Sequence, residues 1–153
     1  DEQEALVKLS HDVGQEVPPG TEVGKRHESA FGDIDNISRL KDFLANGDAP
    51  VYLGWGSMIA VSPEHMARTA VEALMTSKKR GIILGGWAKL NEAMLQSAPN
   101  ADQLIKYVQD GQVFFINSAP HEWLFPQCSV LVHHGGSGTT AASVRSGRPT
   151  IIT

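Results

Sequence analysis

The chain has 153 residues with a formal net charge of −4, and 41% of its residues are hydrophobic and 20% charged. This composition is typical of one globular domain and excludes the disordered and fibrous classes. The acidic balance argues against a nucleic-acid partner, and every apolar run is far shorter than the roughly 18 residues of a membrane span. The single cysteine, Cys128, suits a reducing compartment, so we expect a cytoplasmic protein.

The amino-terminal part differs in pattern from the remainder. Residues 1–35 mix Pro, Gly and charged residues without a sustained period, which indicates a linker or irregular arm. Over residues 36–46 apolar side chains recur at helical spacing, and this predicts a short amphipathic helix with Asp35 or Asn36 as its N-cap. We therefore place one folded domain at residues 36–153.

From Pro50 onward, short apolar runs alternate with helical segments. Buried apolar runs of this length, separated by helices, are typical of parallel strands covered on both faces. The expected class is α/β with a doubly wound parallel sheet, in which ligands bind beyond the carboxyl ends of the strands. Strands are predicted at residues 51–55, 81–86, 113–117, 129–134 and 150–153, and helices at 62–80, around 90–95 and from 137 to 147.

The stretch SVLVHHGGSGTTAA, residues 129–142, follows this plan with small residues directly after a strand. A helix that begins there exposes free backbone N–H groups and a partial positive charge, so we expect a phosphate group at this point. Gly138 lets an anion approach the backbone, while Ser137, Thr139 and His134 add side-chain donors. The alternative is a glycine-rich turn without a ligand.

Other chemistries fit the sequence less well. Residues 136–141 match the dinucleotide fingerprint, so an NAD-dependent oxidoreductase domain is an alternative, although no acidic residue follows about 20 positions later. Ser57 in GWGSMI lacks the second glycine of a hydrolase nucleophile turn. His133 and His134 point to opposite faces of a strand and cannot easily share a metal ion with His121, so no metal is expected and His133 is interpreted as structural.

The segment SAPHEWLFPQ, which precedes the predicted phosphate loop, contains a possible platform for a nucleobase. The face of Trp123 could stack on a base, and His121 could share that site. The alternative is that Trp123 belongs to the core.

Two stretches, GDAPVYLGWGSM and SAPHEWLFPQCSVLVHHGGSGTTAASVRSGRPTII, together resemble a known family. They are similar to the carboxy-terminal, nucleotide-sugar-binding half of GT-B glycosyltransferases, and most of all to sterol 3-beta-glucosyltransferases of fungi and plants. The resemblance covers about residues 48–153. It implies a Rossmann-like sheet, one half of the GT-B fold, and inverting transfer of glucose from UDP-glucose to a sterol or other lipid hydroxyl without a cofactor or required metal.

The resemblance also implies roles for particular residues, all of them in donor binding, because the catalytic base is expected in the amino-terminal domain. Ser57 would face the donor diphosphate. At the uridine end would lie His121, Trp123 and the backbone of Ala119. The diphosphate itself would be held by His134, Ser137, Gly138 and Thr139.

The sequence differs from the family pattern in lacking two segments that family members have. Relatives extend into a loop ending in Asp-Gln that contacts the sugar, and this chain stops at Thr153, so we expect a domain truncated at its carboxyl end. The family's amino-terminal domain, which brings the acceptor pocket, is absent, and we expect a fragment with little or no activity alone. The full-length protein would be cytoplasmic, with peripheral membrane association left open. The remaining alternative is a non-catalytic nucleotide-binding module.

Overall fold

The computed structural model of the chain describes residues 34–153. The arm predicted at residues 1–35 therefore lies outside the described residues, except for its last two. These two belong to helix α3, Ile34–Ala45. The predicted cap is wrong, because the helix begins ahead of both Asp35 and Asn36.

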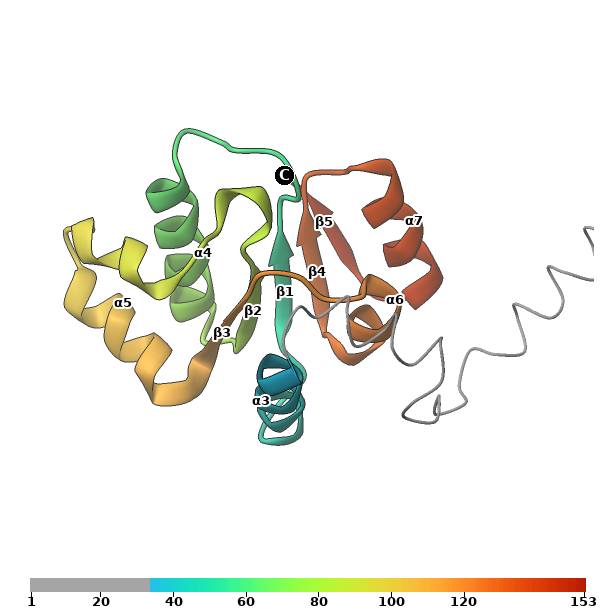
Figure 1. Cartoon of the computed structure of the whole chain (residues 1–153), viewed down its shortest axis with the longest axis horizontal. Coiled ribbons are helices and arrows are strands. Elements are labelled where there is room, and N and C mark those ends of the chain that lie inside the picture. Colours follow the sequence, from blue (N-terminus) through green and yellow to red (C-terminus); the bar gives the residue numbers. More distant parts are fainter. Residues whose placement is uncertain (1–33) are drawn as a thin grey trace, which may run out of the picture.

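Five parallel strands form one sheet in the order β3-β2-β1-β4-β5 (Figure 1), which confirms the predicted α/β class and doubly wound parallel sheet. The chain moves outward from the central strand to β3 and then returns to the other side of the centre. The point where the strand order reverses therefore lies between β1 and β4. The strands are β1 Val51–Gly54, β2 Gly81–Leu84, β3 Val113–Ile116, β4 Val130–His133 and β5 Thr150–Ile152.

The strands β1 to β4 end one or two residues earlier than their apolar runs predict. At the end of β2, for example, the chain turns at once, and the N–H of Gly85 donates to the carbonyl of Ile116 at 2.7 Å. Each strand thus gives its last predicted residues to a loop at the carboxyl edge of the sheet, where ligands of this fold bind.

Helix α4, Pro63–Ser77, shows how local sequence sets the helix ends. Its N-cap is Ser62, whose hydroxyl oxygen accepts the N–H of His65 at 3.2 Å, and Lys78 ends the helix in a left-handed conformation. The helix predicted around residues 90–95 is a 3₁₀ segment, Glu92–Ser97. The other α-helices are α5 Ala101–Tyr107, α6 His121–Leu124 and α7 Ser137–Ser146. Short 3₁₀ segments lie at Gly86–Ala88 and Phe125–Gln127, and a π-helical segment at Val108–Gln112.

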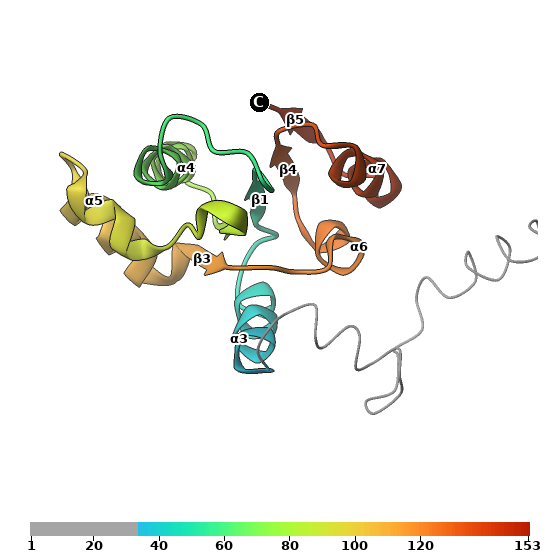
Figure 2. The ribbon, with the colours of Figure 1, turned by 45° about the horizontal axis from the view of Figure 1, so that its top comes forward.

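Two hydrophobic clusters, one on each face of the sheet, form the core. Successive strand residues alternate between them: Tyr52 and Ile82 belong to one cluster, and Leu53 and Ile83 belong to the other. Helices α4 and α5 lie on one side and α6 and α7 on the other (Figure 2). None of the helices in the described part has the length and apolarity needed to cross a membrane.

Candidate functional site: the carboxyl edge between β1 and β4

The strand order places the candidate site between the ends of β1 and β4. In the sheet Gly54 pairs with His133, so the loops that follow the two strands begin side by side. The β1 loop contains Ser57, and the β4 loop leads into α7. Two segments that are about 80 residues apart in the sequence thus meet at one edge.

His133 is fully buried at the end of β4. Its Nε2 lies 2.9 Å from the hydroxyl of Ser143, which itself donates to the carbonyl of Thr139 at 2.8 Å, and its Nδ1 accepts the N–H of Gly135 at 3.0 Å. Because the Ser143 hydrogen is used, Nε2 must carry the ring proton. Burial lowers the pKa of His133, and the neighbouring His134 lowers that pKa further. His133 is therefore a neutral group that joins β4 to α7, which agrees with its interpretation as a structural residue.

His134 has different surroundings from its neighbour. Its half-buried ring lies between two glycines: a Cβ atom on Gly56 would come within 3.1 Å of Cε1, and one on Gly136 within 2.7 Å of Nε2. The ring therefore joins the β1 loop to the β4 loop. A side chain at position 136 would force the ring to shift, and one at position 56 would be tight against it. Its Nδ1 is buried and has no hydrogen-bond partner among residues 34–153.

Helix α7 begins at the same place, with Gly136 as its N-cap and no side chain capping its first turn. The N–H groups of Ser137, Gly138 and Thr139 have no acceptor within the helix, and the helix dipole adds partial positive charge there. A Cβ atom on Gly138 would meet nothing within 4 Å, so the backbone is open to approach. Thr140 Oγ1 is a further buried polar atom without a partner in the part of the chain that the structure describes.

Ser57 lies exposed in the β1 loop. The N–H of Met58 donates to the carbonyl of Trp55 at 2.9 Å and closes the turn around it. The indole Nε1 of Trp55 donates to Oγ1 of Thr153 at 3.3 Å, which ties this turn to the residue after β5. The structure thus brings Ser57 to the edge where His134 and the start of α7 lie.

The residues predicted for the uridine end lie on a neighbouring segment. His121 begins α6, where Nε2 lies 3.2 Å from the Tyr52 hydroxyl and the ring stacks on Phe125 with centroids 4.5 Å apart. Burial lowers the pKa of His121, the neighbouring His133 lowers it further, and Glu122 opposes both. Ala119 and Trp123 pack against the same core cluster. The geometry does not join these three to the phosphate-loop residues, and their roles stay predictions.

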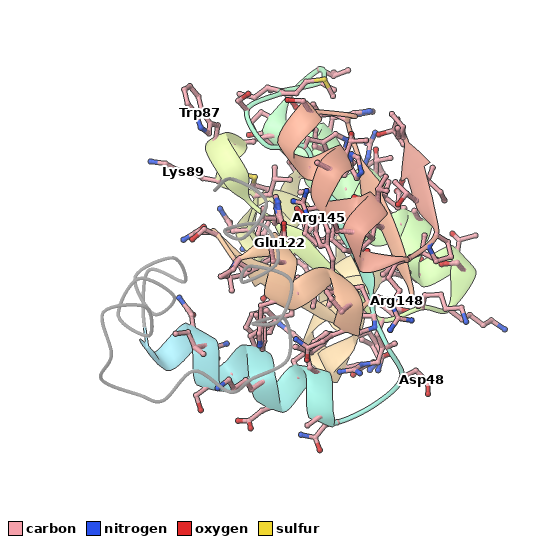
Figure 3. The ribbon with its side chains drawn as sticks, turned by 90° about the vertical axis from the view of Figure 1, so that its right-hand side faces the viewer. Asp48, Trp87, Lys89, Glu122, Arg145 and Arg148 are labelled. Carbon is pink, nitrogen blue, oxygen red and sulfur yellow. The ribbon has the colours of Figure 1, made fainter. Side chains whose placement is uncertain are left out.

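An ion pair holds this segment beside α7. Arg145 of α7 points toward Glu122 of α6 (Figure 3), and the guanidinium donates to the carboxylate. Both side chains are largely exposed, so the pair contributes little to stability. It shows that these faces of α6 and α7 are turned toward each other.

The loop after β2 also belongs to this edge, although its sequence did not predict it. The N–H of Trp87 donates to the carbonyl of Gly56 at 3.1 Å, which places this loop against the one that carries Ser57. Its only signal in the sequence was a glycine pair at the end of an apolar run.

No group of three or more His, Cys, Asp and Glu side chains within residues 34–153 is arranged to hold a metal ion.

A hollow of about 760 Å³ lies at the opposite, amino edge of the sheet, where Arg39, Phe43, Arg80 and Phe114 contribute to its lining.

No family model matches the chain. A sterol 3-beta-glucosyltransferase of Arabidopsis thaliana is 41% identical over 115 residues, which is 75% of this chain and 16% of that protein. The sterol 3-beta-glucosyltransferase of Gibberella zeae is 39% identical over 126 residues, 79% of this chain and 8% of that protein. That of Debaryomyces hansenii is 34% identical over 129 residues, 82% of this chain and 8% of that protein.

The chain spans at most 16% of the length of these relatives, so it corresponds to one segment of them. The matches extend over most of the chain, and the parallel sheet with helices on both faces is that of one half of the GT-B fold. The predicted resemblance is thereby confirmed: the chain belongs to the GT-B glycosyltransferases, as part of a carboxy-terminal domain similar to that of the sterol 3-beta-glucosyltransferases.

Proposed function

We propose that the chain is the donor-binding part of an inverting glycosyltransferase that transfers glucose from UDP-glucose to a sterol or related lipid hydroxyl. One observation carries the proposal. At the point where the strand order reverses, the uncapped start of α7 lies beside His134, whose buried Nδ1 has no partner among the described residues. A diphosphate would supply acceptors for these donors.

The proposed chemistry follows from the charge that the donor develops. As the bond between the sugar and UDP breaks, the leaving diphosphate gains negative charge, and donors already oriented toward it lower the barrier. The N–H groups of Ser137, Gly138 and Thr139 would supply this stabilisation, together with His134. Ser57 would contact the diphosphate from the β1 loop. Such a site can work without a cation.

The uridine would lie toward α6, near Ala119, His121 and Trp123. Because Tyr52 occupies Nε2 of His121, that ring would contact the base through its remaining edge. Trp123 is half-buried against the core, so only part of its face would be offered to a base.

The acceptor pocket and the base that activates the acceptor would belong to the rest of the enzyme. We therefore propose that the chain alone has little or no transferase activity, and that the whole enzyme is cytoplasmic and acts on a sterol or lipid acceptor at a membrane surface. The choice of a sterol as the acceptor is supported by the names of the relatives, which are sterol 3-beta-glucosyltransferases.

Calorimetric titration of the chain with UDP, UDP-glucose and NAD tests the donor site. We expect UDP and UDP-glucose to bind and NAD to bind more weakly. His134→Ala should weaken UDP binding by about tenfold, the value of one hydrogen bond to a charged group. His65→Ala, which alters an exposed histidine of α4, is the control and should leave the affinity unchanged.

Two outcomes would contradict the proposal. Tighter binding of NAD than of UDP would favour the oxidoreductase alternative. UDP binding by the chain, without turnover of any UDP-sugar by the full-length parent, would favour the non-catalytic module.

A further inference from the structure

We propose that Gly86 is a positioning residue of the donor site. Because it has no side chain, the loop after β2 can hold the β1 loop in the position that binding of the donor phosphates requires. The inference rests on the proposed function for the identity of the ligand. Its geometric part stands on contacts among Gly86, Gly56 and His134.

The contact between the two loops is between backbones. A Cβ atom on Gly86 would lie 2.6 Å from the carbonyl oxygen of Gly56, a distance that real Cβ atoms essentially never show. The next residue, Trp87, donates its N–H to the same oxygen at 3.1 Å. Gly86 thus leaves the space into which this carbonyl fits, and Trp87 binds it there. A flexible side chain could move aside, but a backbone carbonyl moves only with its whole loop.

The β2 loop is itself fixed to the sheet. Gly85 donates its N–H to the carbonyl of Ile116 at 2.7 Å, and Gly86 donates to that of Asn117 at 3.3 Å. These bonds to the end of β3 leave the β2 loop little freedom to give way. A side chain at position 86 would therefore displace the β1 loop rather than its own.

The displacement would reach the donor site in one step. The Gly56 backbone also lies against the His134 ring, where a Cβ atom on Gly56 would come within 3.1 Å of Cε1. The His134 ring in turn lies against Gly136, the N-cap of α7. Ser57 follows Gly56 directly. Moving the Gly56 carbonyl would therefore move Ser57 and press on His134, both of which are proposed to bind the donor phosphates.

The side chain of Trp87 does not take part in this arrangement. Its indole is 79% exposed and points away from the body of the molecule (Figure 3). The interaction that matters is that of its backbone N–H. Trp87→Ala is therefore expected to keep the β1 loop in place and to leave UDP binding within about twofold of the wild type.

The test compares Gly86→Ala with Gly111→Ala in the full chain. Both glycines have a positive φ, +54° and +75°, so both variants carry the strain of a left-handed residue. Only Gly86 has an obstacle at the Cβ position, since nothing lies within 4 Å at Gly111. By titration at a temperature where both variants are folded, we expect Gly86→Ala to bind UDP at least tenfold more weakly than Gly111→Ala. Equal affinities would overturn the proposal.

A second measurement needs no ligand. The imidazole resonances of His134 in NMR spectra of the free chain should shift in Gly86→Ala and stay in place in Gly111→Ala. Unshifted resonances in both would overturn the inference. Failure of the wild type to bind UDP would instead contradict the proposed function, and the NMR comparison would still decide the role of Gly86.

If Gly86→Ala does not fold, a hydrogen-exchange measurement on the wild type takes the place of the comparison between variants. The Trp87 amide should exchange as slowly as that of Gly85, because both are held by backbone carbonyls. Exchange of the Trp87 amide at the rate of an exposed loop would overturn the proposal.

Discussion

The two edges of the sheet differ in how their polar groups are satisfied. At the amino edge, the hollow of about 760 Å³ contains Arg80, whose guanidinium donates to the carbonyls of Asp48 and Phe43 and lies 4.0 Å from the centre of the Phe43 ring. At the carboxyl edge, His134 Nδ1 and Thr140 Oγ1 have no partner within residues 34–153, and α7 is uncapped. The half-buried cation that lines this hollow thus has hydrogen-bond partners, whereas these two buried polar atoms at the carboxyl edge have none.

This difference shows why shape alone is a poor guide to the site in this chain. A buried polar group without a partner costs about 1–3 kcal/mol, so its persistence needs an explanation, and a bound ligand is one. The hollow at the amino edge offers volume between α3 and the sheet, but Arg80, which contributes to its lining, already donates to two carbonyls. Substitutions at either edge test whether the two edges have different roles.

The largest effect is expected from the two neighbouring histidines at the carboxyl edge. His133→Ala removes a fully buried ring and leaves the Gly135 N–H without its acceptor, so the free energy of unfolding should fall by about 3 kcal/mol. His134→Ala removes no hydrogen bond made within the described residues and should cost about 1 kcal/mol or less. Urea unfolding of both variants measures this contrast. Equal losses would show that the two rings do not have separate structural and binding roles.

At the amino edge, Arg80→Ala should lower the free energy of unfolding by about 2 kcal/mol, because two carbonyls lose their donor and the Phe43 ring loses the guanidinium that packs on it. UDP affinity should stay within about twofold of the wild type. Unfolding and titration on the same sample separate the two quantities. A large loss of UDP affinity would mean that the amino edge takes part in donor binding.

The pH dependence of stability should follow the buried histidines. In the folded chain, burial lowers the pKa values of His121 and His133 below their ordinary value of 6.5, so the unfolded chain binds more protons. Their contribution is therefore complete above about pH 6.5 and is lost as the pH falls through the lowered folded values. Thermal unfolding between about pH 7.5 and 5 should show the decline, also in the His65→Ala control. Stability that rises toward acid pH would contradict the neutral state assigned to His133.

The sequence was sufficient for much of this arrangement. Apolar runs predicted all five strands, and the residue types of HHGGSG predicted a helix start beside a histidine. What it could not supply were contacts between loops. Position 86 looks like an ordinary glycine in the sequence, because the carbonyl that it accommodates belongs to Gly56, 30 residues earlier.

Two other differences have local causes. Helix α5 was not predicted because, of its seven residues, only Leu104 is fully buried, and one such position sets no period. The Tyr52 hydroxyl beside His121 was also unforeseen, since the two residues meet only after the chain has crossed the sheet and returned. Long-range partners of this kind leave no periodic signal.

The smallest effect on stability, and the sharpest test of the carboxyl edge, concerns Gly138. A Cβ atom there meets nothing within 4 Å, and alanine is favoured over glycine in a helix by about 0.5–1 kcal/mol, so Gly138→Ala should unfold at a slightly higher temperature. UDP affinity should nevertheless fall by about tenfold, because the new methyl group would occupy space that the phosphate needs. Gly147→Ala, at a glycine with φ +65° beyond the last turn of α7, should lose stability and keep its UDP affinity. If Gly138→Ala binds UDP as the wild type does, the phosphate does not approach the first turn of α7, whatever the unmet donors there suggest.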